Sequence, residues 1–247
     1  MSRYKSQGRM LRIAALTCGI SCLLRAEDPA RQKVQVSSTQ RLELAPGGTV
    51  RVKNSTGELT VEGWDQPGVE ITTVKSTRAE YTAAERETAA RDLDSVRIAA
   101  EQGSGEVAIT TSYARRRKEI FAILASRDTN IEVSYRIRVP RDARLIVDHE
   151  IGGIYVDEVT GDVHASARQG AITLRLPQED KYELDAKSAT GSVTSDFPGS
   201  TKRRGWLVGH AFLQAAQAPH KLYLRTGFGD IIILRERKPQ TPASLTP

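Results

Sequence analysis

A chain of 247 residues is long enough for one large domain or two small ones, and its hydrophobic fraction of 39% lies at the low end for a globular core. Strands that are buried on one side need an apolar residue only at every second position, which gives such a fraction. The formal charge of +6 falls to +1 without residues 1–26, which hold five basic residues and no acidic one. A nearly neutral chain lacks the charge that supplies most non-specific nucleic-acid affinity, so we expect no nucleic-acid partner.

Residues 1–26 have the pattern of a secretory signal peptide. A basic start is followed by an apolar run, 13–24, that is too short to span a bilayer, and Ala26 is the expected cleavage point. Both cysteines, Cys18 and Cys22, lie in this segment, so the mature chain is expected to have no disulfide and no thiolate site. The sequence predicts export to the periplasm, the outer surface or the medium, without a transmembrane span. Lipid attachment at Cys22 is the less favoured alternative.

The N-terminal region, 27–140, is predicted to contain strands, one helix and one hairpin. Alternating apolar residues separated by Pro- and Gly-containing turns predict a small set of strands within 41–74. An Ala-, Glu- and Arg-rich stretch, 77–97, predicts a helix with Thr82 and Glu85 as a capping box. We expect this helix to cover the open end or one face of a sheet.

The same region continues with the predicted hairpin and the most regular strand of the chain. Two alternating runs, 96–98 and 107–109, flank glycines and predict the hairpin. A basic segment, 114–130, follows as an insertion in which the charges are expected to be solvated. Residues 131–139 then alternate without a break, and Pro140 ends the predicted strand.

From 141 to 237 the chain repeats one phrase, a glycine followed by apolar residues two and four positions later. Full phrases begin at Gly152, Gly170, Gly209 and Gly229, and a weaker copy, in which Ser195 takes the second apolar place, begins at Gly191; the steps are 18, 21, 18 and 20 residues. Such a period, with alternation inside each unit, indicates stacked β coils, because one coil cannot bury its apolar face alone. A second alternating run lies about halfway between glycines, so each coil is expected to hold two strands. An earlier copy of the phrase at Gly57 places a first coil near the N-terminus.

The pattern therefore predicts an all-β fold for 27–237: a β-solenoid, similar to a single-stranded β-helix, with one short helix and an N-terminal strand region. An antiparallel β-sandwich with glycines in its hairpins is the alternative. The phrases place Ile172, Leu174, Ala211, Leu213, Ile231 and Ile233 at inward positions and Thr173 and Ile232 at outward positions. The tail, 238–247, has three prolines and little apolar content, and is expected to be disordered.

Few residues suggest chemistry. Asp148, His149 and Glu150 are adjacent, but successive residues of a strand point to opposite faces, so at most two of them can converge. The four histidines, His149, His164, His210 and His220, lack the spacing of metal ligands, and no cysteine supplements them. The sequence therefore predicts no catalytic, cofactor-binding or metal site.

The acidic residues at the coil corners lead to the same expectation. Asp162 and Asp230 follow their glycines at equivalent places and are expected to align near one edge of the stack. The tandem phrase of calcium-binding coils is absent, so they are interpreted as solvated turn carboxylates. Asp157 and Glu158 are likewise expected at corners that water reaches, where carboxylates make poor general acids.

The order of these pieces resembles a known family. Residues 52–61 (VKNSTGELTV) lead into Gly63, Trp64 and Asp65; a helix, a hairpin, residues 135–142 (YRIRVPRD) and glycine phrases at Gly153, Gly161 and Gly170 follow. This order is similar to the bacterial putative adhesin family, a set of exported domains of unknown function. The resemblance covers about 40–235 and implies a β-solenoid, with departures at 114–130 and 199–209. It implies no catalytic residues.

These observations predict a non-enzymatic exported protein of the cell envelope or surface, acting in adhesion, scaffolding or self-association. Its expected partners are surface glycans, envelope proteins or further copies of itself. A polysaccharide-acting β-helix enzyme, a lyase or a glycosidase, is the alternative, but it needs clustered carboxylates and stacking aromatics, for which only Trp64, Trp206 and a few tyrosines are available. An accessory or sensing role at the envelope is the remaining possibility.

Overall fold

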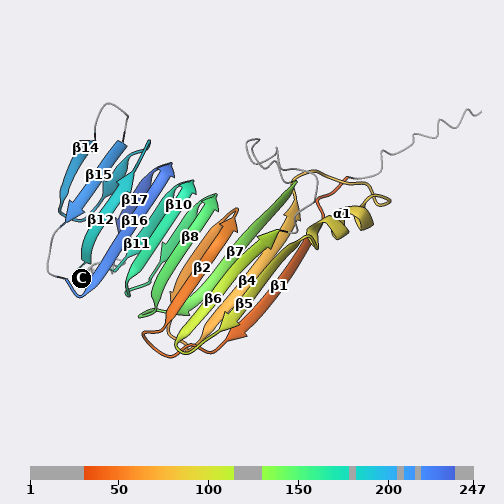
Figure 1. The fold of residues 1–247 in the computed structure, drawn as a ribbon, viewed down its shortest axis with the longest axis horizontal. Coiled ribbons are helices and arrows are strands. Elements are labelled where there is room, and N and C mark those ends of the chain that lie inside the picture. The colour runs from red at the N-terminus through yellow and green to blue at the C-terminus, as the bar shows by residue number, and fades with distance from the viewer. Residues whose placement is uncertain (1–30, 114–129, 178–181, 205–208, 215–217, 237–247) are drawn as a thin grey trace, which may run out of the picture.

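The structure, a computed structural model, describes residues 31–113, 130–177, 182–204, 209–214 and 218–236. These residues form two mixed β-sheets around one hydrophobic core, with one short helix at one end (Figure 1). The all-β prediction is confirmed for this part of the chain. The predicted signal peptide, most of the basic insertion and the predicted disordered tail lie outside the described residues.

The first sheet has eight strands. In spatial order they are β1 (Gln35–Leu42), β4 (Val69–Thr77), β7 (Ile131–Pro140), β3 (Leu59–Trp64), β9 (Ile154–Asp157), β11 (Ile172–Leu176), β17 (Ile231–Arg235) and β13 (Val193–Ser195). The pairs β1–β4 and β4–β7 are antiparallel, and the other pairs are parallel. Strand β7 matches the predicted strand that Pro140 ends.

The second sheet has nine strands. In spatial order they are β14 (Ser200–Arg204), β15 (Gly209–Gln214), β12 (Tyr182–Ser188), β16 (His220–Phe228), β10 (Val163–Gln169), β8 (Arg144–Ile151), β2 (Thr49–Thr56), β6 (Glu106–Tyr113) and β5 (Val96–Gln102). The strands from β12 to β6 pair in parallel, while β14, β15 and β5 are attached by antiparallel pairs. Strands β5 and β6 form the predicted hairpin.

Glycine corners join the two sheets. At Gly57, Gly152, Gly170, Gly191 and Gly229 the chain leaves a strand of the nine-stranded sheet and enters one of the eight-stranded sheet. Gly152 has φ +126°, and a Cβ atom there would lie 1.8 Å from the carbonyl oxygen of Gly57 in the adjacent corner. Only glycine combines this backbone conformation with so close an approach. Each of these corners therefore joins a strand of one sheet to a strand of the other.

The inward and outward positions predicted from the glycine phrases are correct for most of the phrases. Ile172 pairs in register with Ile154 on one side and Ile231 on the other, and all three side chains are buried. Thr173 and Ile232 lie between these buried positions on the outer face and are half-buried. Because these parallel strands are in register, each buried aliphatic side chain lies next to a similar one on the neighbouring strand. The core therefore consists of rows of aliphatic side chains.

The structure corrects the stacking order that successive coils would give. β16 lies between β10 and β12. The last corner of the chain, at Gly229, therefore lies between the corners at Gly170 and Gly191 rather than at the end of the stack. The two sheets also remain open, with β1 and β5 at one end and β13 and β14 at the other. The corner strands pair in parallel, so they also differ from the alternative prediction, an antiparallel sandwich with glycines in its hairpins.

The phrase at Gly209 does not form a coil corner. Strand β15 is antiparallel to both of its neighbours; Phe212 is buried, and Leu213 is 47% exposed instead of facing inward. A period of two allows either face of a strand to turn inward, and here the larger ring of Phe212 enters the core. Gly199 leaves room for that ring, because a Cβ atom at Gly199 would lie 2.2 Å from Phe212 Cζ.

The helix, α1, spans Arg86–Leu93 and is shorter than the predicted stretch. Its buried residues are Ala89 and Leu93, whereas Ala83 and Ala84 precede it and are exposed. The capping box forms only in part: the Thr82 N–H donates to the Glu85 carboxylate at 3.1 Å, but Glu85 itself occupies the N-cap position without a side-chain cap. The helix contacts β1 and β4 at the open end of the sheets, as expected (Figure 1).

Candidate functional site

The adjacent residues Asp148, His149 and Glu150 do not converge. His149 is buried, and its Nδ1 lies 2.7 Å from the hydroxyl of Ser55, which is also buried. Burial lowers the pKa of His149, against the effect of neighbouring backbone carbonyl groups. Asp148 and Glu150 point to the outer face, where Glu150 pairs with Arg168 at 2.9 Å. Strand alternation separates the histidine from the carboxylates, as the sequence predicted, so the three form no common acid–base site.

The other histidines lie apart from His149 on different strands. His164 is on β10 beside the Tyr223 ring, His210 Nδ1 lies 3.1 Å from the Gly191 carbonyl oxygen, and His220 is on β16 near Tyr182. Among the described residues, no group of three or more His, Cys, Asp or Glu side chains is arranged to hold a metal ion.

The prediction that Asp162 and Asp230 align at one edge is wrong. Asp162 precedes β10 and Asp230 follows β16, and because these strands are parallel the two residues lie at opposite edges of the sheet. Asp162 accepts a hydrogen bond from the Lys221 N–H at 2.9 Å. Asp230 accepts bonds from the backbone N–H and the hydroxyl of Ser192 at 2.7 and 2.8 Å, which lower its pKa. Each carboxylate therefore fastens its corner to the neighbouring strand.

The corner carboxylates Asp157 and Glu158 are paired with arginines. Asp157 lies 3.1 Å from Arg175, the adjacent residue of the next strand, and Glu158 lies 2.7 Å from Arg141. Both carboxylate side chains are about one third exposed (37% and 34%), so water reaches these corners. Pairs of this kind are worth little individually. They make the corners parts of a cross-strand charge pattern.

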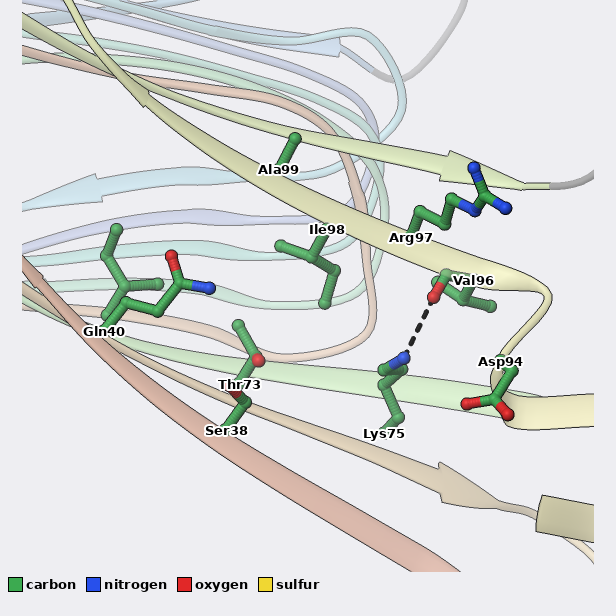
Figure 2. A pocket seen from close by; sticks show the side chains of 10 residues that line it. Ser38, Gln40, Thr73, Lys75, Asp94, Val96, Arg97, Ile98 and Ala99 are labelled. Carbon is green, nitrogen blue, oxygen red and sulfur yellow. Dashed lines mark hydrogen bonds between the residues drawn. The ribbon is translucent and has the colours of Figure 1, made fainter. Parts of the chain in front are cut away.

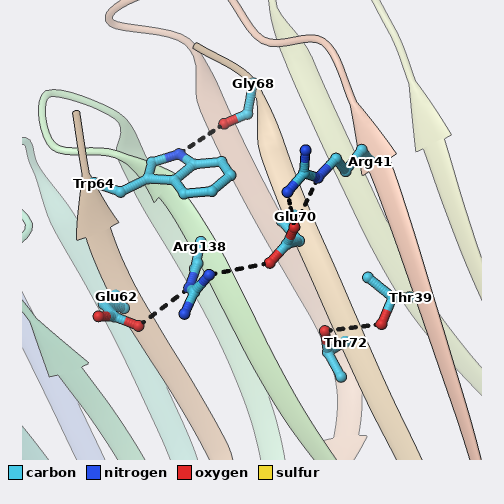
Figure 3. Close-up of polar contacts among 8 residues, drawn as sticks. All are labelled: Thr39, Arg41, Glu62, Trp64, Gly68, Glu70, Thr72 and Arg138. Carbon is cyan, nitrogen blue, oxygen red and sulfur yellow. Dashed lines mark hydrogen bonds and ion pairs between the residues drawn. The ribbon is translucent and has the colours of Figure 1, made fainter. Parts of the chain in front are cut away.

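A ladder of charges crosses the outer face of the eight-stranded sheet (Figure 3). Arg41 pairs with Glu70 at 2.6 Å, Glu70 with Arg138 at 3.3 Å, and Arg138 with Glu62 at 3.4 Å. Trp64 lies beside this ladder, with the guanidinium carbons of Arg41 and Arg138 at 6.0 and 5.9 Å from its ring. The ring is half-buried, and its Nε1 donates to the Gly68 carbonyl at 3.2 Å. Trp64 thus packs within the molecule, and Trp206 lies outside the described residues.

The row next to this ladder is rich in threonine. In spatial order, its members are Thr39, Thr72, Arg136, Thr60, Tyr155, Thr173, Ile232 and Thr194, one from each strand of the sheet. Tyr155 is 43% exposed and is the one aromatic member of the row. The sequence carried a signal for it, because Tyr155 occupies the outward place between Ile154 and Val156.

The outer face of the nine-stranded sheet has a second exposed tyrosine. Tyr223 is 45% exposed, and the guanidinium carbon of Arg225 lies 3.6 Å from the centre of its ring. Arg225 also pairs with Asp185 at 2.7 Å, and the His164 ring lies 5.7 Å from the tyrosine ring. Burial works to raise the pKa of Asp185, but hydrogen bonds from Arg225 and Lys187 outweigh it and lower that pKa. We call Tyr223, Arg225, Asp185 and His164 the tyrosine patch.

Two hollows in the described part of the chain lie near residues discussed above. The larger, about 440 Å³, lies at the open end, where Ile71 of β4 and Ile98 of β5 form part of its wall (Figure 2). The smaller, about 270 Å³, lies at the corners, between the Glu150–Arg168 pair and Gly57. Gly57 itself is required by the close approach of its corner to β7, because a Cβ atom there would lie 1.9 Å from the Val133 carbonyl oxygen. The glycines of this hollow therefore do not indicate a ligand.

Comparison with known proteins gives the family. A family model described as Toastrack DUF4097 matches residues 29–234. This chain belongs to that family. No curated protein matches the chain. Among the described residues of this Toastrack-family protein, none of the helical structure is long and apolar enough to pass through a bilayer.

Solved structures of low similarity accompany this match. A putative cell adhesion protein from Clostridium sporogenes is 13% identical, with a TM-score of 0.44 over 82% of this chain and 100% of that chain. A putative adhesin from Parabacteroides distasonis is 8% identical, with a TM-score of 0.21 over 80% of this chain and 70% of that chain. A putative lipid binding protein from the same species is 9% identical, with a TM-score of 0.24 over 81% of this chain and 97% of that chain.

Proposed function

We propose that this Toastrack-family chain is a non-enzymatic, exported protein of the cell envelope or surface, which acts by binding as an adhesin or scaffold module. The observation that carries the proposal is the tyrosine patch on a broad outer sheet face. Tyr223 is exposed, yet its ring is in contact with the Arg225 guanidinium and lies beside the His164 ring. Tyrosine combines an apolar ring with a polar tip, which suits it to glycan and protein surfaces.

The geometry of the patch favours binding over turnover. Because Asp185 pairs with Arg225 and Arg225 stacks on Tyr223, the patch is arranged before a ligand arrives, which reduces the entropy lost on binding. Glycoside hydrolysis needs one carboxylic acid that can donate a proton beside a second carboxylate. Asp185, the carboxylate of the patch, has a lowered pKa and therefore stays ionised. A single contact of this kind is weak, and many copies on a surface would turn it into avidity.

We propose as well that the regular region is a β-solenoid of two-strand coils. In support, β2, β8, β10 and β16 are parallel in one sheet, with register shifts only at the end of β2 near its corner. The strands that follow them across the glycine corners are parallel and in register in the other sheet. Such a stack presents two extended faces, on which Tyr155 and Tyr223 stand. Surface glycans, envelope proteins and further copies of the chain remain the proposed partners.

The binding role is tested with an array of immobilised cell-surface polysaccharides, using the protein both free and coupled to beads. We expect weak binding by the free protein and retention at least about a hundredfold stronger on beads. Tyr223→Ala should weaken binding about tenfold, the scale of one aromatic contact, whereas Phe228→Ala, an exposed aromatic residue at a strand end, should not. Polysaccharide cleavage that disappears in Asp185→Asn would establish the enzyme instead.

Export is tested separately, by intact-mass measurement of the protein from its native host. The expected species has lost residues 1–26. A mature protein that still contains Met1, or one that begins at a lipidated Cys22, contradicts soluble export.

A further inference from the structure

Two edge strands lie together at the open end of the sheets. Within the described residues, β5 pairs only with β6, and β1 pairs only with β4. Edge strands expose unpaired N–H and C=O groups, and most proteins protect them with lysine, proline, a bulge or a covering element. Neither strand contains lysine or proline, β1 has no charge from Gln35 to Gln40, and β5 has only Arg97 and Glu101. The helix α1 packs beside β1 and β4, whereas no described strand pairs with the free side of β5, so β5 is the edge that can accept a further strand.

The β5–β6 hairpin determines which backbone groups of β5 are free. The Gly103 N–H donates to the Glu106 carbonyl at 2.7 Å, which closes the hairpin. In an antiparallel pair the residues that exchange hydrogen bonds recur at every second position. Arg97 and the other odd-numbered residues up to 101 therefore bond to β6, while Ile98 and Ala100 direct their N–H and C=O groups away from it.

An independent contact agrees with this assignment. The carbonyl oxygen of Val96, an even-numbered residue, accepts a hydrogen bond at 3.0 Å from the Lys75 amine, which comes from the opposite sheet and not from β6 (Figure 2). The side chains of Ile98 and Ala100 are half-buried and pack against the core at its open end. The free edge of β5 thus combines unpaired backbone groups with an apolar inner face.

The outer face of β5 is complementary to itself. Arg97 and Glu101 are both exposed and lie two residues before and after Ala99. When a second β5 runs antiparallel with Ala99 opposite its counterpart, each Arg97 faces a Glu101 of the other copy. The same register places Ile98 opposite Ala100, so that the outward N–H and C=O groups of the two strands can bond. Opposite charges at directly facing positions stabilise a strand pair, and like charges destabilise it.

We propose that a second copy of this chain docks on β5, through antiparallel pairing about a two-fold axis at Ala99. The pairing joins two nine-stranded sheets into one continuous sheet, and the interface is the same patch on both copies. An axis normal to the sheets also brings β1 towards its counterpart. The hollow of about 440 Å³ beside Ile98 then lies between the two copies, so its apolar wall is shielded from water. This assembly does not depend on which ligand the tyrosine patch binds.

Charge reversal tests the register directly, in the protein purified from its host and studied by sedimentation equilibrium. Glu101→Arg, or Arg97→Glu, places like charges opposite each other twice and should weaken the dimer at least tenfold. The double variant Arg97→Glu/Glu101→Arg restores opposite charges and should return the dissociation constant to within about threefold of the original. Glu183→Arg makes the same charge change on the outer face of β12, far from β5 in the sheet order, and should leave the dimer unchanged.

Hydrogen exchange gives a second readout that needs no variant. Raising the protein concentration should protect the amides of Ile98 and Ala100, which are free in one copy, and should leave that of Ala99, already bonded to β6, unchanged. A protein that stays monomeric at about 100 µM overturns the proposal, as does a dimer that both single reversals leave intact. Capture of a strand from a different protein at β5, with no self-association, also overturns it.

Discussion

Replacing Ile231 and Ile232 separately by aspartate tests which face of β17 is inward. Ile231 is fully buried between Ile172 of β11 and Val193 of β13. Ile232 is half-buried on the outer face, between Thr173 and Thr194. The two substitutions make the same chemical change at neighbouring positions of one strand, so a difference between them reports the direction of the side chain.

The two costs are expected to differ by several kcal/mol. Removing the buried aliphatic side chain of Ile231 costs about 2–5 kcal/mol, and a carboxylate without a partner in its place adds about 2 kcal/mol or more. The summed cost approaches the free energy of unfolding of a typical domain, roughly 5–15 kcal/mol, so Ile231→Asp should not fold. Ile232→Asp loses β propensity and part of one contact, about 1 kcal/mol. Its melting temperature should fall by about 2–4 °C.

Thermal unfolding followed by circular dichroism measures both variants, with Ile231→Val as a control that keeps the site apolar. The control should lose about 0.5–1.5 kcal/mol. Equal effects of the two aspartates, or a greater effect at Ile232, would refute the inward assignment and with it the register of β17 on β11.

Two further predictions concern the corner and the buried histidine. Gly152→Ala should lower the free energy of unfolding in urea by more than about 3 kcal/mol, because the new Cβ atom would meet a backbone carbonyl oxygen at 1.8 Å. Gly105→Ala is the control: Gly105 has φ +76° and nothing within 4 Å of a Cβ atom, so this change should cost only about 1 kcal/mol. Because burial lowers the pKa of His149 below its ordinary value of 6.5, the folded state binds a proton more weakly than the unfolded chain. Stability in urea should therefore be level above about pH 6.5 and should fall as the pH drops below it. His149→Gln should remove part of this dependence and His164→Gln, on the outer face, should not; identical pH profiles for the two variants would contradict the assignment.

The sequence determined which face of most strands is inward. In β11 and β17 the alternation of large aliphatic residues with threonine or a single outward isoleucine leaves one face that can be buried, and Ile172 and Ile231 occupy it. The corner glycines were also readable, because a backbone such as that of Gly152 excludes other residues. Local rules of this kind act between residues close in the chain, so a single sequence carries them.

The tertiary structure alone decided which strands are neighbours. The sequence order of the coils does not give the insertion of β16 between β10 and β12, and the phrase at Gly209 did not reveal that β15 is antiparallel with Phe212 inward. The tyrosine patch depends on the same insertion, because it brings Tyr223 beside His164 and Arg225 beside Asp185. A period of two fixes the face of a strand but not its partner, and the partner is selected by packing and hydrogen bonding between residues far apart in the chain.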